Sequence, residues 1–166
     1  MGLWKKYLET ATNFAVLCTC VLIGYVAVTR FVLPQANRQN ETLAVGTKLK
    51  VTSIDWSQHD QTLVLALSTQ CHFCSQSAEF YRRAVSAADG KQTHIIAVLP
   101  QATVDSRLYL EQLGVNVTDI RQLPLETVGV KATPTVLLVD NNGVIAKAWV
   151  GKLPASNEAE VLAQVR

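Results

Sequence analysis

The chain has 166 residues, which suits one domain and a short appendage, and its net charge is +2 at neutral pH. The sequence has no basic stripe interleaved with aromatic residues, so it does not favour nucleic acid as a partner. Four cysteines at uneven spacing are too few for a small fold held together by disulfides.

The first segment of the chain is apolar. Residues 11–29 carry no charged side chain, and together with residues 31–33 they approach the roughly 20 residues that cross a bilayer as a helix. A cleaved signal peptide is the alternative, but its apolar core would be shorter and Pro34-Gln35-Ala36 is a poor cleavage site. We therefore predict a short N-tail and a transmembrane anchor over residues 1–33, inserted through residues 11–33, and a polar linker over residues 34–42.

The orientation of this anchor is inferred from its flanks and from the domain that follows it. Lys5 and Lys6 favour a cytoplasmic N-tail, although basic residues on the other flank leave the positive-inside comparison undecided. Long C-terminal domains translocate largely regardless of charge, and disulfide chemistry is favoured outside the cytoplasm. We expect a single-pass protein of the plasma (inner) membrane with residues 43–166 on the extracytoplasmic or periplasmic side.

The C-terminal part alternates between strand-like and helix-like segments. Apolar runs typical of buried strands lie at 63–67, 93–99 and 135–140, and an alternating segment at 48–55 predicts a strand or extended arm. Helices are predicted from Cys71 to Ala88, from Thr103 or Asp105 to Leu113, briefly over 123–128, and from a Ser156 cap onward. Asn141-Asn142-Gly143 predicts a hairpin turn into a last strand at 144–150. This order predicts an α/β sheet with helices on both faces.

Cys71 and Cys74 follow the apolar run 63–67 and open the next helix. The unpaired N–H groups and the dipole at a helix N-terminus favour an anion, and the thiolate is the nucleophilic form of cysteine. Two cysteines separated by two residues on a first helical turn can close a disulfide with little backbone movement. Cys71, nearer the helix tip, is interpreted as the attacking thiol, and Cys74 as the thiol that resolves the mixed disulfide.

A second motif lies about 60 residues downstream, in Gly129-Val130-Lys131-Ala132-Thr133-Pro134-Thr135. The order strand, CxxC, helix, this motif and a strand–Asn-Gly–strand hairpin resembles the thioredoxin superfamily, especially its membrane-anchored extracytoplasmic members. The resemblance covers roughly Leu43 to Arg166. It implies a thioredoxin-like mixed sheet, a redox-active Cys71–Cys74 disulfide with no other cofactor, and protein thiols or disulfides as partners.

The resemblance also implies roles for residues around the pair. The Thr133–Pro134 bond should be cis, and the Thr133 backbone should pair with an extended substrate peptide. His72 and Phe73 are expected to modulate the pair, since an imidazolium would stabilise the Cys71 thiolate and favour oxidation, whereas Phe73 offers an apolar cover.

The sequence departs from the family at two places. Gln70 stands where many members have an aromatic residue, and the strand 63–67 is wholly apolar where thioredoxins place a buried acid. Glu79 lies five residues past Cys74, so on an ideal helix it points away from that sulfur. The sequence therefore identifies no proton acceptor for Cys74.

The predicted function is thiol–disulfide oxidoreductase, with a slight preference for reductase because many tethered relatives reduce extracytoplasmic partners. The oxidase and isomerase directions, and the identity of the electron donor, stay open. One alternative is a copper- or zinc-handling module using the two cysteines with His72 or His94, but a single CxxC supplies too few ligands for a usual zinc site, and no metal is expected. Another alternative is a peroxide-reducing redoxin, because Ser68-Thr69-Gln70-Cys71 partly matches the peroxiredoxin Thr-x-x-Cys without its proline.

Overall fold

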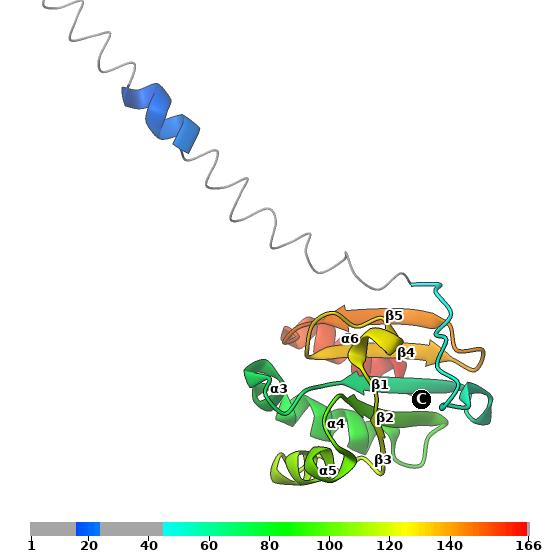
Figure 1. The fold of residues 1–166 in the computed structure, drawn as a ribbon. Helices are drawn as coiled ribbons and strands as arrows, with labels where there is room; N and C mark the ends of the chain where they lie inside the picture. Colours follow the sequence, from blue (N-terminus) through cyan, green and yellow to red (C-terminus); the bar gives the residue numbers. More distant parts are fainter. Residues whose placement is uncertain (1–15, 24–44, 166) are drawn as a thin grey trace, which may run out of the picture. The chain divides into compact units, whose positions relative to one another are not determined.

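The computed structural model describes residues 16–23 and 45–165 (Figure 1). The described residues belong to two units, 1–40 and 41–166, and each unit is considered by itself. Residues 16–23 are helical. Within the described ranges no helix has both the length and the apolar character needed to cross a membrane. The rest of the predicted anchor and the whole predicted linker lie outside the described residues.

Residues 45–165 form a five-stranded mixed sheet with the strand order β3-β2-β1-β4-β5. The strands are β1 (Gln61–Ala66), β2 (Thr93–Leu99), β3 (Asp119–Gln122), β4 (Thr135–Asp140) and β5 (Ile145–Val150). β2 runs parallel to both β1 and β3, whereas β4 is antiparallel to β1 and to β5. The helices are α3 (His72–Gln76), α4 (Ala78–Ala88), α5 (Thr103–Gln112), α6 (Ala155–Gln164) and the 3-10 helices η3 (Trp56–Gln58) and η4 (Leu125–Val128). The mixed α/β sheet predicted from the sequence is confirmed.

Strands β2 and β4 have the predicted bounds, and β1 lies within two residues of its prediction. The helix predicted after Cys71 is divided into α3 and α4 at Ser77, whose backbone angles are not helical. β3 is not among the predicted strands, because its sequence, Asp-Ile-Arg-Gln, has a single apolar residue. The predicted Ser156 cap is wrong: α6 starts at Ala155 with Pro154 at the N-cap, two residues before Ser156, whose hydroxyl contacts Asn157 instead.

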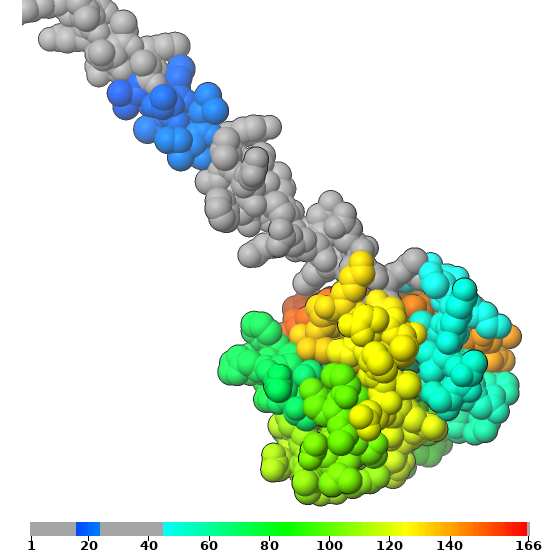
Figure 2. All heavy atoms as spheres, viewed as in Figure 1, coloured from blue at the N-terminus to red at the C-terminus, as the bar shows by residue number. Residues whose placement is uncertain are grey.

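The two faces of the sheet are covered differently. Leu63 and Leu65 of β1 pack in one buried cluster with side chains from α4, α5 and α6. Val64 and Ala66, which point the other way, pack in a second cluster with residues of η3, η4 and the segment 45–55. In Figure 2 this segment (cyan) and the chain around η4 (yellow) lie side by side. In the described part of the chain, the helices that cover the second face of the sheet are therefore 3-10 helices.

A tight turn joins β4 to β5, and Trp56 of η3 packs against it. Asp140 Oδ1 accepts hydrogen bonds from the backbone N–H groups of Asn142 (2.9 Å) and Val144 (2.8 Å). Gly143 has φ +77°, and a Cβ atom there would lie 2.7 Å from Cδ1 of the buried Trp56. The turn therefore requires glycine both for its backbone angle and for the indole packed against it.

Candidate active site

The CxxC motif sits where β1 passes into α3. After β1, the backbone N–H of Leu67 still donates to Val98 at 3.0 Å, and the chain then turns so that the Cys71 N–H donates to the Ser68 carbonyl at 3.1 Å. Cys71 is the N-cap residue of α3, and its Sγ accepts a hydrogen bond from the Cys74 backbone N–H at 3.2 Å. The structure thus places Cys71 at the helix N-terminus, as the sequence predicts, with its sulfur in the position of a capping oxygen.

The two thiols have different environments. Cys71 is partly exposed, whereas Cys74 has no exposed surface. Burial raises the pKa of the Cys74 thiol to about 12, and the neighbouring Cys71 adds to this rise. The Ser68 backbone and the Thr133 side chain, which hydrogen-bond to Cys74, lower the pKa in part. A partner can therefore reach Cys71 first, and Cys74 can react only with the sulfur of Cys71.

The Thr-Pro-Thr segment lies against this pair. Thr135, the first residue of β4, is opposite Ala66, the last residue of β1, so the loop before β4 meets the turn that leads to Cys71. The Thr133–Pro134 peptide bond is cis. The Pro134 carbonyl accepts a hydrogen bond from the Gly151 N–H at 2.7 Å, which ties the loop to the end of β5. The tertiary structure therefore brings the two predicted motifs together.

His72 and Phe73 are both on the surface of the first turn of α3. Phe73 is 55% exposed, and its ring lies 5.9 Å from that of His72 between centroids. His72 Nε2 is 2.7 Å from Nε2 of Gln76, whose carbonyl oxygen accepts a hydrogen bond from Lys152 Nζ at 3.1 Å. These side chains form the outer rim of the site and leave Phe73 available to a partner.

Two tyrosines near the pair are absent from the sequence-based prediction. Tyr109 of α5 is partly buried, and its hydroxyl is 3.3 Å from Ser75 Oγ in α3. Tyr81 of α4 is 1% exposed. Burial raises the pKa of each hydroxyl, and negative charge on Cys74 raises both further. The available signal for Tyr81 is its position seven residues after Cys74, on the same helical face, whereas only the packing of α5 reveals Tyr109.

Glu79 plays no part at the thiols. Its carboxylate is exposed and pairs with Arg82. The pKa of the Cys74 thiol is set by burial and by Cys71, Ser68 and Thr133, none of which carries a carboxylate. The proton acceptor that the sequence does not identify is therefore not a neighbouring carboxylate in the described part of the chain.

His94, one of the two histidines considered as a metal ligand, lies far from the cysteines along β1. His94 is near the start of β2, opposite Thr62 at the start of β1, whereas the cysteines follow the other end of β1. Its Nε2 is 3.1 Å from Asp119 Oδ2, and its ring stacks on His59 with centroids 4.3 Å apart. Over residues 16–23 and 45–165, no cluster of three or more Cys, His, Asp or Glu side chains could hold a metal ion. The ligand set of Cys71, Cys74 and His94 is thus not brought together.

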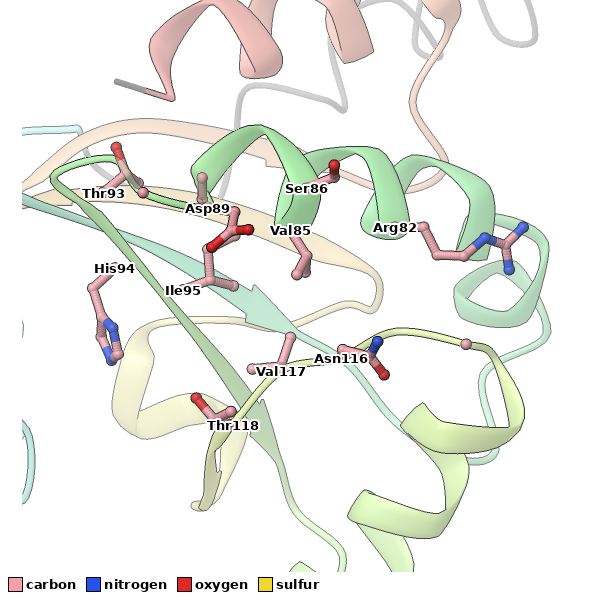
Figure 3. Close-up of a pocket in the computed structure, with 13 residues that line it drawn as sticks. Arg82, Val85, Ser86, Asp89, Thr93, His94, Ile95, Asn116, Val117 and Thr118 are labelled. Atoms are coloured by element: carbon pink, nitrogen blue, oxygen red, sulfur yellow. The ribbon is translucent and has the colours of Figure 1, made fainter.

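A cavity of about 570 Å³ lies at the same end of the sheet as His94 (Figure 3). The end of α4, the start of β2 and the segment before β3 line it, with Asp89, His94 and Asn116 among its polar residues. Neither cysteine belongs to the lining. This cavity is therefore separate from the thiol pair.

No family model matches the sequence, and no curated protein matches it either. Solved structures do resemble it. A structure from Chlorobium tepidum described as the thiol:disulfide interchange protein DsbE superposes with a TM-score of 0.58 at 22% identity, over 75% of this chain and 99% of that one. The thioredoxin domain of a thiol-disulfide oxidoreductase from Bacteroides vulgatus gives 0.57 at 18% identity, over 74% and 98%. StoA from Bacillus subtilis gives 0.51 at 15% identity, over 62% and 82%.

Proposed function

We propose that this chain, whose C-terminal domain has the thioredoxin fold, is a thiol–disulfide oxidoreductase that acts on protein disulfides. The observation that carries the proposal is the asymmetric pair at the start of α3, with a reachable Cys71 capping the helix and a fully buried Cys74 behind it. Two structural neighbours, one described as a thiol:disulfide interchange protein and one as a thiol-disulfide oxidoreductase, support the same function.

The reaction follows from this asymmetry. The Cys71 thiolate attacks one sulfur of a partner disulfide, forming a mixed disulfide and releasing the other partner sulfur as a thiolate. Cys74 then loses its proton to that thiolate and attacks Cys71. The Cys71–Cys74 bond forms, the bond to the partner breaks, and the partner leaves with both sulfurs reduced. The reverse sequence oxidises a partner; we propose the reductase direction, which the sequence resemblance favours.

We propose that the partner binds along the Thr-Pro-Thr segment. An extended peptide that presents its disulfide to Cys71 would lie beside Thr133 and Pro134, where main-chain hydrogen bonds can add it as a short strand. Phe73, two residues after Cys71, offers an exposed apolar contact. The predicted anchor over residues 11–33 would hold this site at the extracytoplasmic surface of the plasma membrane.

The experiment that tests the function is a covalent trap. Cys74→Ala removes the resolving thiol, so a partner attacked by Cys71 should remain attached as a mixed disulfide that dithiothreitol releases. The full chain is expressed in its native membrane, and adducts are separated on non-reducing gels and identified. Cys71→Ala is the matched control and should trap nothing. If neither variant gives a reducible adduct, the proposed attack by Cys71 is wrong.

A further inference from the structure

The groups around the thiol pair come from four short segments, which together are called the active-site rim. The turn after β1 and α3 carry the cysteines, and the loop before β4 carries the cis Thr133–Pro134 bond. The segment after β5 joins that loop, because the Gly151 N–H donates to the Pro134 carbonyl at 2.7 Å. The segment after β2 joins the turn, because Gln101 Nε2 donates to Ser68 Oγ at 3.1 Å. The rim thus comprises residues 67–77, 100–102, 129–135 and 150–154.

The charge of this rim has one sign. None of the 13 aspartate and glutamate residues of the chain lies in it, whereas it contains two lysines, Lys131 and Lys152. Both lysines are exposed, and neither forms an ion pair with a carboxylate within residues 16–23 and 45–165. The histidine of the rim, His72, can add only positive charge. The rim therefore presents two positive charges to solvent with no carboxylate in contact with them.

Each lysine lies beside a group that the proposed exchange uses. Lys152 Nζ donates to Gln76 Oε1 in α3 at 3.1 Å, and the residue before Lys152 is hydrogen-bonded to the Pro134 carbonyl. Lys152 therefore connects the loop before β4 to the helix of the thiols. Lys131 is two residues before Thr133, so the Cα atoms of these two residues lie within about 7 Å of each other. A peptide that binds beside Thr133 and Pro134 therefore comes within reach of both lysines.

We propose that the protein partner presents an acidic segment to this rim, in which aspartate or glutamate stands beside the cysteine of the reactive disulfide. The inference rests on the proposed exchange at Cys71 and names the class of its substrate. Complementary charges across an interface speed association and disfavour partners of the wrong charge. An anionic lipid surface would match the lysines in charge, but it would cover the thiol that must meet a partner disulfide.

The proposal is tested with three peptides that differ only in charge. Each peptide has one cysteine flanked by glutamate, serine or lysine, and it is dimerised through its disulfide. The reduced full chain, in a non-ionic detergent, attacks the dimer through Cys71 and releases one peptide as a thiol. Cys74 then releases the second peptide thiol as the Cys71–Cys74 disulfide forms. Each rate constant is divided by that of the same peptide with dithiothreitol, which corrects for the intrinsic reactivity of its disulfide.

The parent protein should prefer the glutamate peptide. At low ionic strength we expect its corrected rate to be about tenfold higher than that of the lysine peptide, with serine between them, because an exposed ion pair changes affinity by up to about fivefold. In 1 M salt the Debye length is about 3 Å, so the difference should shrink to less than about twofold. The double variant Lys131→Gln, Lys152→Gln should show a preference of about twofold or less at low ionic strength.

The matched control is the double variant Lys50→Gln, Lys91→Gln, which removes the same charge from exposed positions outside the rim. Lys50 follows Leu49, whose N–H donates to the Gly143 carbonyl in the turn after β4, and Lys91 comes just before β2. Both positions are therefore at the end of the sheet away from the cysteines. This control should keep the tenfold preference. Equal corrected rates for the three peptides, or a preference that survives in the rim variant, would overturn the proposal.

The outcome also separates this inference from the proposed function. If the chain reduces none of the peptides and the covalent trap captures no protein, the exchange is refuted and the inference with it. If all three peptides are reduced at equal corrected rates, only the inference is refuted. If vesicles of phosphatidylglycerol slow the parent but not the rim variant while the three peptides react equally, the lysines bind lipid and the acidic partner is wrong.

Discussion

The sulfur of Cys71 accepts a hydrogen bond from the backbone N–H of Cys74 at 3.2 Å, while the side chain of Cys74 is fully buried. The backbone N–H of Cys74 therefore stabilises the Cys71 sulfur, while the Cys74 sulfur is inaccessible to a partner. A hydrogen bond to the charged form of a group favours that form, so this contact supports Cys71 as the nucleophile. Because it is buried, Cys74 is suited only to the intramolecular attack on Cys71.

Thr133→Val should weaken the resolving step. Valine keeps the shape of threonine but removes the hydroxyl that lowers the pKa of Cys74. Without that hydroxyl, the pKa of Cys74 should rise further from its ordinary value. The reduced full chain is mixed with dithiobis(nitrobenzoate), whose released thiolate is coloured; the first phase reports attack by Cys71 and the second reports displacement by Cys74. Loss of one hydrogen bond to sulfur should slow the second phase by about fivefold. Thr135→Val is the control, since its hydroxyl donates to the Ala132 carbonyl at 2.7 Å, and it should leave this phase unchanged. An unaltered second phase in Thr133→Val would contradict the prediction.

The reduced protein should lose stability as the pH rises from about 9 to about 12. Burial is the main reason that the pKa of Cys74 is raised from its ordinary value of 9.0 to about 12 in the folded chain. The unfolded chain therefore releases this proton first and binds fewer protons in this window, so the free energy of unfolding falls with pH. Below pH 9 both states keep the proton and the full contribution is present.

This pH dependence is measured by urea unfolding of the reduced full chain at a series of pH values. Cys74→Ser removes the titrating thiol and should make the dependence of the unfolding free energy on pH less steep than in the parent. The remaining slope is due to other groups such as Tyr81, whose pKa burial also raises. Parallel curves for the parent and the variant would show that Cys74 contributes nothing.

Phe73→Ser should separate small disulfides from protein disulfides. Phe73 is 55% exposed, so its removal should change the free energy of unfolding by less than about 0.5 kcal/mol. Burial of the ring against a protein partner is worth about 1.5 kcal/mol or more, so reduction of a protein disulfide should slow about tenfold. The attack of Cys71 on dithiobis(nitrobenzoate), a small disulfide, should not change in rate. Leu108→Ser, at another exposed apolar residue, is the control and should match the parent with both substrates.

Gly143→Ala should destabilise the fold more than Gly90→Ala. Both glycines have positive φ, +77° and +68°, which costs alanine about 1 kcal/mol or more. A Cβ at Gly143 would also meet the Trp56 ring at 2.7 Å, whereas a Cβ at Gly90 meets nothing within 4 Å. We expect an extra loss of about 1–3 kcal/mol for Gly143→Ala in thermal or urea unfolding. Equal losses would mean that the indole moves aside without cost.

The regular elements that the sequence predicts are those with strong local signals. Contiguous apolar runs mark β2 and β4, because these strands are buried on both faces of the sheet. The position of Cys71 at the start of a helix follows from the strand before it and the apolar spacing after it. β3 has no such signal, since it is a four-residue edge strand paired only with β2 among the described strands. The cap of α6 depends on how the chain leaves β5, which residue type alone does not specify.

The sequence by itself determined the thiol pair at a helix start, because two cysteines with two residues between them are a local arrangement. Only the tertiary structure decided which groups surround them. The pairing of β1 with β4 carries Thr133 to Cys74, and the packing of α3, α4 and α5 against one face of the sheet buries Tyr81 and brings Tyr109 beside the pair. These contacts join residues distant in the chain. They depend on sheet order and on the burial of apolar faces, which no local spacing specifies.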